Sequence, residues 1–126
     1  MPEHSVTLVF DNFPALPEEE LERLLAPLAE NPPEGCTYEL RYGDHMVTGI
    51  READSRFAAV AEVAAEVKSR CGLAFNGAGI EKPDEWLGED HGQQVSAHLV
   101  LAAVHRAKHC GVSPEELVRL IQAVRE

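Results

Sequence analysis

A β-hairpin pattern at residues 37–50 constrains the fold of this chain more than any other feature. Polar and apolar residues alternate through Thr37–Tyr42, Gly43-Asp44 supplies a tight turn, and His45–Ile50 has the composition of a returning strand. A period of two places one side of each strand against a core, and a short glycine-containing turn joins antiparallel neighbours. The chain therefore contains antiparallel sheet, and other elements must cover its apolar face.

The segments around this hairpin predict the order strand, helix, strand, strand, helix, strand. An apolar, β-branched run at Ser5–Asp11 predicts a buried first strand. Pro17 opens a helix in which leucines recur with helical spacing, and Asp54 or Ser55 can cap the next helix. Leu73–Asn76 is expected to form a short fourth strand. This order is that of a ferredoxin-like βαββαβ sandwich, an α+β fold in which two helices back a four-stranded antiparallel sheet.

Two additional C-terminal helices are expected after the sandwich. The first runs from about Asp90 to Cys110, and Ser113 begins a capping box with proline at the first helical position of the second. The last helix is expected to bury the face formed by Leu117, Leu120, Ile121 and Val124. Residues 1–126 then form a single domain. The C-terminal pair either covers an exposed part of the sandwich or supplies the contact of a homodimer.

The charge balance restricts the partners that this chain can have. Its 22 acidic and 11 basic residues give a net charge of −11. Such a charge repels nucleic-acid phosphates and anionic lipid, so neither nucleic acid nor a membrane is an expected partner. It attracts basic surfaces. The acidity therefore serves either solubility alone or the docking of a basic protein partner.

The cysteines and the N-terminus indicate a reducing compartment. Cys36, Cys71 and Cys110 are odd in number and form no C-x-x-C pair, which argues against a disulfide framework and a zinc ribbon. Met1–Ser5 has no basic and apolar signal pattern, and no run approaches the ~20 apolar residues that span a bilayer. A cytoplasmic location is expected.

Four histidines share one stripe of the helix expected at about 90–110, namely His91, His98, His105 and His109. Residues seven apart lie about 10.5 Å apart along a helix, too far to bind one ion together. Only His105 and His109, spaced i and i+4, could chelate a divalent metal such as zinc. Two alternatives stay open: packing at the boundary of an apolar face, and a pH-sensitive contact. That apolar face is formed by Val95, Leu99, Ala103 and Cys110.

No catalytic residues are predicted. Gly77, Gly79 and Lys82 have neither the spacing of a P-loop nor that of a dinucleotide-binding motif. Cys71 lies on an apolar helix stripe, which is typical of a buried core thiol rather than a nucleophile. No nucleophile, base and orienting group occur together in the sequence.

The best candidate for a partner-binding patch is an acidic segment around the single tryptophan. Trp86 is surrounded by the carboxylates of Asp84, Glu85, Glu89 and Asp90. Tryptophan is enriched among interface hot spots, although it could equally fasten this loop to the core. We therefore expect a non-enzymatic acidic protein-binding module, without a cofactor, that inhibits or neutralises a basic partner protein. The alternative is a small metal-dependent enzyme or metal-sensing protein that uses His105 and His109.

Overall fold

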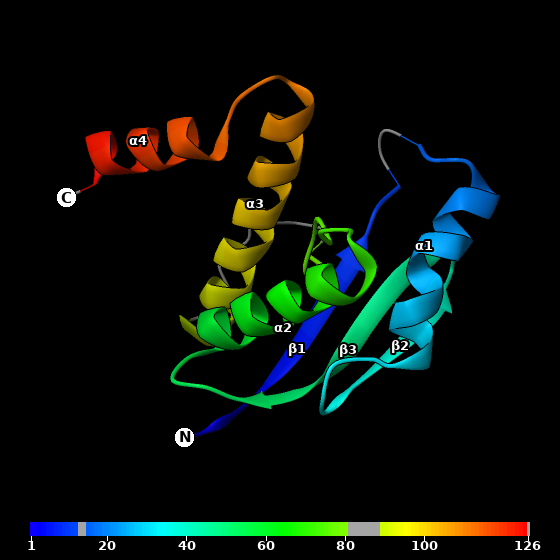
Figure 1. Ribbon diagram of the computed structural model, residues 1–126. Coiled ribbons are helices and arrows are strands. Elements are labelled where there is room, and N and C mark those ends of the chain that lie inside the picture. Colours follow the sequence, from blue (N-terminus) through cyan, green and yellow to red (C-terminus); the bar gives the residue numbers. More distant parts are fainter. Residues whose placement is uncertain (13–14, 81–88, 126) are drawn as a thin grey trace.

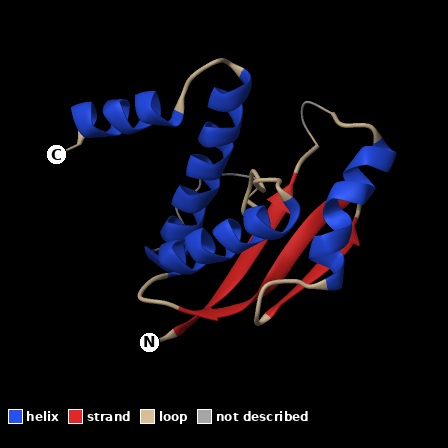
Figure 2. Cartoon of the chain, viewed as in Figure 1, coloured by secondary structure: helices blue, strands red, loops and turns tan. Residues whose placement is uncertain are grey.

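Three strands pair into one antiparallel sheet in the order β1-β3-β2. The strands are β1 (Glu3–Phe10), β2 (Cys36–Arg41) and β3 (Asp44–Glu52). The computed structural model describes residues 1–12, 15–80 and 89–125. In that part of the chain the sheet is accompanied by four helices, so the fold is α+β (Figures 1 and 2).

One face of the sheet carries the core. Val6, Leu8 and Phe10 alternate along β1 with more exposed residues, and Leu8 pairs with the fully buried Val47 of β3. The helices α1 (Glu18–Glu30) and α2 (Arg56–Cys71) pack on this face. Their buried residues include Leu21, Leu25 and Leu28 of α1 and Val60, Val63, Val67 and Cys71 of α2. We call residues 1–80 the body.

The predicted fourth strand is wrong, and the four-stranded ferredoxin-like sheet is not formed in the described residues. Leu73–Asn76 is not a strand, and a single antiparallel bridge joins Val9 to Gly77. Phe75 is nevertheless buried, and its ring centroid lies 5.7 Å from that of Phe10. Phe75 thus belongs to the core although its segment is not a strand. The backbone of this segment pairs only with the end of β1, and the chain then turns at Gly79, whose φ is +75°.

The two C-terminal helices are α3 (Glu89–His109) and α4 (Pro114–Val124). The first turns of α3 pack against α2, where Gln93 accepts a hydrogen bond from the Phe57 amide at 3.1 Å. Ala97 of α3 joins the buried core. The C-terminal end of α3 and the whole of α4 extend away from the sheet (Figure 1). We call residues 99–126 the arm.

The prediction that α4 buries its apolar face is wrong in the described chain. None of its residues is buried, and α4 contacts only α3. Leu120, Ile121 and Val124 are exposed. The sequence predicted the helix and its apolar side correctly, but nothing described in this chain covers that side.

Candidate functional site

The turn of the β2–β3 hairpin places an aromatic ring in solvent. Its two residues are Tyr42 and Gly43, one position earlier than predicted, because Arg41 pairs with Asp44. Both have positive φ, 51° and 83°, as a type I′ turn requires. Tyrosine rarely adopts this conformation, which costs about 1–2 kcal/mol per residue. Tyr42 is 98% exposed, so no packing within the described chain offsets that cost.

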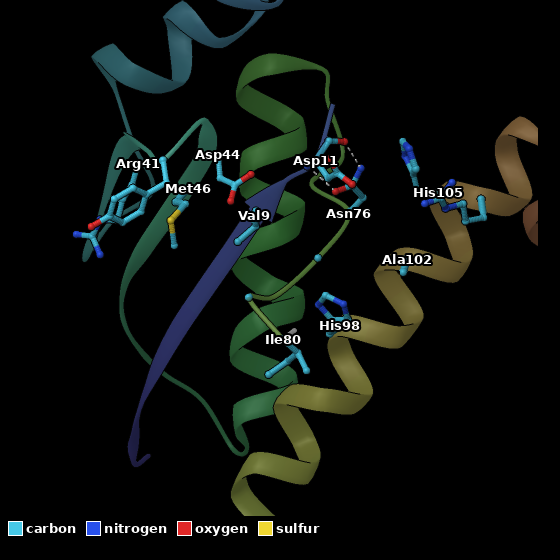
Figure 3. A pocket seen from close by; sticks show the side chains of 14 residues that line it. Val9, Asp11, Arg41, Asp44, Met46, Asn76, Ile80, His98, Ala102 and His105 are labelled. Atoms are coloured by element: carbon cyan, nitrogen blue, oxygen red, sulfur yellow. Dashed lines mark hydrogen bonds between the residues drawn. The ribbon is translucent and has the colours of Figure 1, made fainter. Parts of the chain in front are cut away.

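A cavity of 630 Å³ lies between this hairpin and α3 (Figure 3). Tyr42 and Met46 line it on the hairpin side, and Val9 contributes from β1. The segment after α2 and helix α3 line the other side, and charged and polar groups lie on both sides. Those groups are Asp11, Arg41, Asp44, Asn76, His98, His105 and Arg106. The volume is within the range of small-molecule sites, which is about 300–1,000 Å³.

His98 is held in one orientation at the floor of this cavity. Its Nδ1 accepts a hydrogen bond of 2.8 Å from the Ala78 amide. Burial lowers the pKa of the His98 imidazole, which favours the neutral ring. A neutral ring that accepts at Nδ1 carries its proton on Nε2 and is a donor there. A Cβ at Gly77 would lie 3.0 Å from the His98 ring, so glycine permits this close approach.

Asn76 connects the same region to the end of β1. Its side-chain oxygen accepts from the Asp11 amide at 2.9 Å, and its Nδ2 donates to the Asp11 carbonyl at 2.8 Å. The buried amide thus extends the pairing that the Val9–Gly77 bridge begins. In the sequence, the sign of this pairing role is an asparagine that lies between the core residue Phe75 and a glycine. The sequence prediction missed it.

Two residues of the histidine stripe, His98 and His105, face the body, whereas His91 and His109 are exposed. His98 and His105 line the cavity, whereas Leu99 and Ala103, on the expected apolar face, are exposed. The rings of His105 and His109 lie 4.8 Å apart. In the described part of the chain no three histidine, cysteine or carboxylate groups gather as a metal site. A metal on His105 and His109 therefore stays a prediction.

The predicted partner-binding patch falls mostly outside the described residues. Asp84, Glu85 and Trp86 lie there. Glu89 and Asp90 begin α3, and their side chains are also outside the description. The patch therefore stays a prediction too.

Negative charge is concentrated in one part of the molecule. The body has fourteen acidic and six basic residues, a net charge of −8, and residues 81–90 add a further −4. The arm has three acidic and four basic residues, a net charge of +1. Helix α1 alone contains five glutamates and one arginine, and no described ion pair involves those glutamates. Most of the negative charge of the protein thus belongs to its body.

The two body thiols, Cys36 and Cys71, are structural. Both are buried, and burial raises the pKa of each thiol, which disfavours the reactive thiolate. The Cys71 thiol donates to the Val67 carbonyl at 3.2 Å within α2. The prediction that Cys71 belongs to the core is confirmed. Among its described lining residues, the cavity has no serine, threonine, cysteine or lysine to act as a nucleophile.

Comparison of the chain with protein-family models, with curated proteins and with solved structures finds no match. Among the described helices, none combines the length and the apolar character needed to cross a bilayer.

Proposed function

We propose that this chain is a non-enzymatic protein-binding module whose acidic body binds a basic partner protein and thereby inhibits or neutralises it. The observation that carries this proposal is the separation of charge: −8 on the body, −4 on residues 81–90 and +1 on the arm. A field of one sign on one part of a protein steers a partner of opposite charge toward that part.

Tyr42 is the aromatic residue that fits the centre of such a contact. Interface hot spots are enriched in tyrosine, tryptophan and arginine, and strained residues are often found at functional sites. Tyr42 is almost fully exposed, has a strained backbone, and lies between Arg41 and Asp44 at the tip of the hairpin. Trp86 and its neighbouring carboxylates are proposed as a second contact.

The test is capture of a partner by the immobilised full chain from an extract of the native host. We expect a basic protein to bind at low salt and to bind more slowly as salt rises, because screening removes steering. Tyr42→Asn suits the turn, since asparagine tolerates positive φ, and it should weaken capture about tenfold or more. Trp86→Ala should weaken it as well.

The matched control is Ile50→Thr, which removes an exposed apolar side chain from β3 away from the hairpin tip. It should leave capture unchanged. Recovery of no partner at either salt concentration would contradict the proposal. So would capture that Ile50→Thr weakens while Tyr42→Asn does not.

One observation favours the metal alternative, namely the adjacent rings of His105 and His109. A small metal-dependent enzyme or metal sensor would retain about one ion per chain, or per two chains, after purification without a tag. His105→Ala and His109→Ala should each remove that ion. Elemental analysis separates the two functions, because the binding module needs no metal.

A further inference from the structure

The cavity between the hairpin and α3 has an apolar floor. Val9 pairs with Met46, and both side chains lie on the sheet face opposite the core, because side chains alternate along a strand. Ile80 joins them from the segment after α2 (Figure 3). A Cβ at Gly79 would lie 3.1 Å from the Thr7 side chain, so glycine lets this segment run close to β1. The floor therefore suits a hydrocarbon chain that enters from solvent.

Two carboxylates line the same cavity from the sheet side. Asp44 follows the hairpin turn, and Asp11 follows the end of β1 (Figure 3). Neither takes part in an ion pair among the described residues. Asn76 binds the backbone of Asp11, which leaves its carboxylate out of that contact. A cation that enters the cavity is therefore attracted by both carboxylates.

The two arginines of the lining do not cancel this attraction. Arg41 forms an ion pair with Glu39 at 2.9 Å, so that pair carries no net charge. Arg106 belongs to α3, on the side of the cavity opposite the hairpin. The cavity is thus negative on its sheet side and not on its helix side. A matching ligand places a cation toward the sheet.

His98 supplies a hydrogen-bond donor on the helix side. Because its Nδ1 accepts from the Ala78 amide, the neutral ring carries its proton on Nε2. That N–H has no acceptor among the described residues. A peptide carbonyl is an acceptor of the kind it requires. A basic residue of a peptide has both a carbonyl and a cationic side chain, so one such residue matches both sides of the cavity.

The ring of Tyr42 favours arginine over lysine as that residue. Tyr42 lines the cavity at the tip of the hairpin, and it is almost fully exposed. A guanidinium is planar, binds a carboxylate through two N–H groups and stacks on aromatic rings. An ammonium is a more strongly hydrated point charge and lacks this geometry. An aromatic ring beside carboxylates is therefore a better match for a guanidinium.

We propose that the cavity binds an arginine side chain of the basic partner protein. The guanidinium contacts Asp44 and Asp11 and stacks on Tyr42, and its hydrocarbon stem lies over the apolar floor. The carbonyl of the same segment accepts from His98. The cavity volume of 630 Å³ exceeds that of any single side chain, so adjacent backbone fits as well. This inference rests on the proposed function and specifies what the partner presents to the body.

The experiment is an NMR titration of the isotope-labelled full chain with a short peptide. The probe is acetyl-Gly-Arg-Gly-amide, which has neutral ends and one guanidinium. Its control has citrulline in place of arginine, which keeps the shape and removes the charge. We expect the arginine peptide to shift the backbone amides of Asp44 and Ala78 with a Kd of about 1 mM. The citrulline peptide should bind about tenfold more weakly, because it makes no charge-assisted hydrogen bond.

Two variants separate a local contact from the overall charge. Asp44→Asn removes one carboxylate from the cavity and should weaken binding of the arginine peptide about tenfold. Asp54→Asn removes the same charge from an exposed residue just before α2, outside the cavity lining. It should bind the peptide as the wild type does. The amide spectrum shows directly whether each variant is folded.

Equal binding of the arginine and citrulline peptides would overturn the proposal, and so would the absence of shifts at the cavity at about 20 mM peptide. Equal weakening by Asp44→Asn and Asp54→Asn would also overturn it, because the attraction would then be general. Methylguanidinium that binds as tightly as the peptide would assign the cavity to a small free cation instead.

Capture from the host extract tests the proposed function separately. If the arginine peptide binds at the cavity but no host protein is captured, the proposed function fails and the arginine site remains. If Tyr42→Asn weakens capture but the arginine peptide does not bind, the proposed function stands and this inference fails.

Discussion

Helices α1 and α4 have nearly the same local sequence and opposite environments. Proline and glutamates open both, in PEEELERLL at residues 17–25 and PEELVRLI at residues 114–121, and leucines recur at helical spacing in both. Yet α1 buries three leucines whereas α4 buries none. The helix without packing has the better cap, since α1 begins at Pro17 without a side-chain cap and α4 begins with a capping box. Local pattern determines a helix and its apolar side, and the surroundings determine what covers that side.

The largest expected difference between body and arm is in the free energy of unfolding that is lost when a leucine is replaced by alanine. Leu25 of α1 is buried, and Leu25→Ala should lower the free energy of unfolding by about 2–5 kcal/mol. Leu120 of α4 is exposed, and Leu120→Ala should change it by less than about 0.5 kcal/mol. Urea unfolding, followed by circular dichroism, compares the two variants.

Similar losses for Leu25→Ala and Leu120→Ala in the monomer would contradict the distinction between a packed body and an uncovered arm.

The next effect concerns the ion pairs that connect α2 to β3. Arg51 of β3 donates to the Glu66 carboxylate of α2, lies 3.6 Å from Glu62, and donates to the Glu34 carbonyl at 3.2 Å. The hydrogen bond from Arg51 is the main reason that the pKa of Glu66 lies below its ordinary 4.5. Because these side chains are partly exposed, Arg51→Met should cost only about 1–2 kcal/mol.

Because the pKa of Glu66 is lowered, the stability that its pair with Arg51 contributes depends on pH. A carboxyl group whose folded pKa is depressed contributes stability above its ordinary pKa, and this contribution is lost as pH falls through the folded value. Arg51→Met should therefore reduce the loss of stability below pH 4.5. The matched control is Arg41→Met, whose pair with Glu39 is exposed and should be worth less than about 0.5 kcal/mol. Equal costs for the two variants would show that burial does not distinguish the pairs.

The body could be predicted from the sequence because its elements are periodic and cover one another. The alternation in β1 and the hairpin, and the leucine stripe of α1, each have a partner within the first 80 residues. That Leu73–Asn76 would not form the expected fourth strand could not be predicted. Leu73–Asn76 has the right composition, but the Asn76 side chain rather than a backbone ladder pairs with Asp11, and Gly79 turns the chain.

The candidate site was less predictable because it depends on how α3 is placed. The histidine stripe was visible in the sequence, but not that His98 would face inward while Leu99 faced solvent. Helical spacing defines relative angles around an axis and leaves the rotation of the whole helix undetermined. Likewise, the hairpin was predictable, whereas the strain at Tyr42 follows from a one-residue difference in the position of its turn.

A smaller expected effect compares the caps of two helices. Ser55 accepts from the Ala58 amide at the start of α2, and Ser113 accepts from the Glu116 amide at the start of α4. Ser55→Ala should lower the free energy of unfolding of the body by about 1 kcal/mol. Ser113→Ala should leave that free energy unchanged and reduce helicity instead. If Ser113→Ala lowered the unfolding midpoint of the monomer as much as Ser55→Ala, the arm would be part of the cooperative body.

The smallest expected effect lies at His98, where α3 leaves the body. Burial lowers the pKa of this imidazole from 6.5, and the ring accepts from the Ala78 amide. As pH falls below 6.5, the unfolded chain binds a proton more readily than the folded chain, so stability falls until the folded pKa is passed. The charged side chains that line the same cavity are Asp11, Arg41, Asp44 and Arg106, with His105 beside them.

His98→Gln keeps an acceptor for Ala78 and should flatten the profile of melting temperature against pH in this window. His91→Gln removes an exposed histidine from the same helix as a control. If the melting temperature of His98→Gln still fell with pH, the fall would not come from His98 at the junction between body and arm. The same would follow if His91→Gln abolished the fall equally.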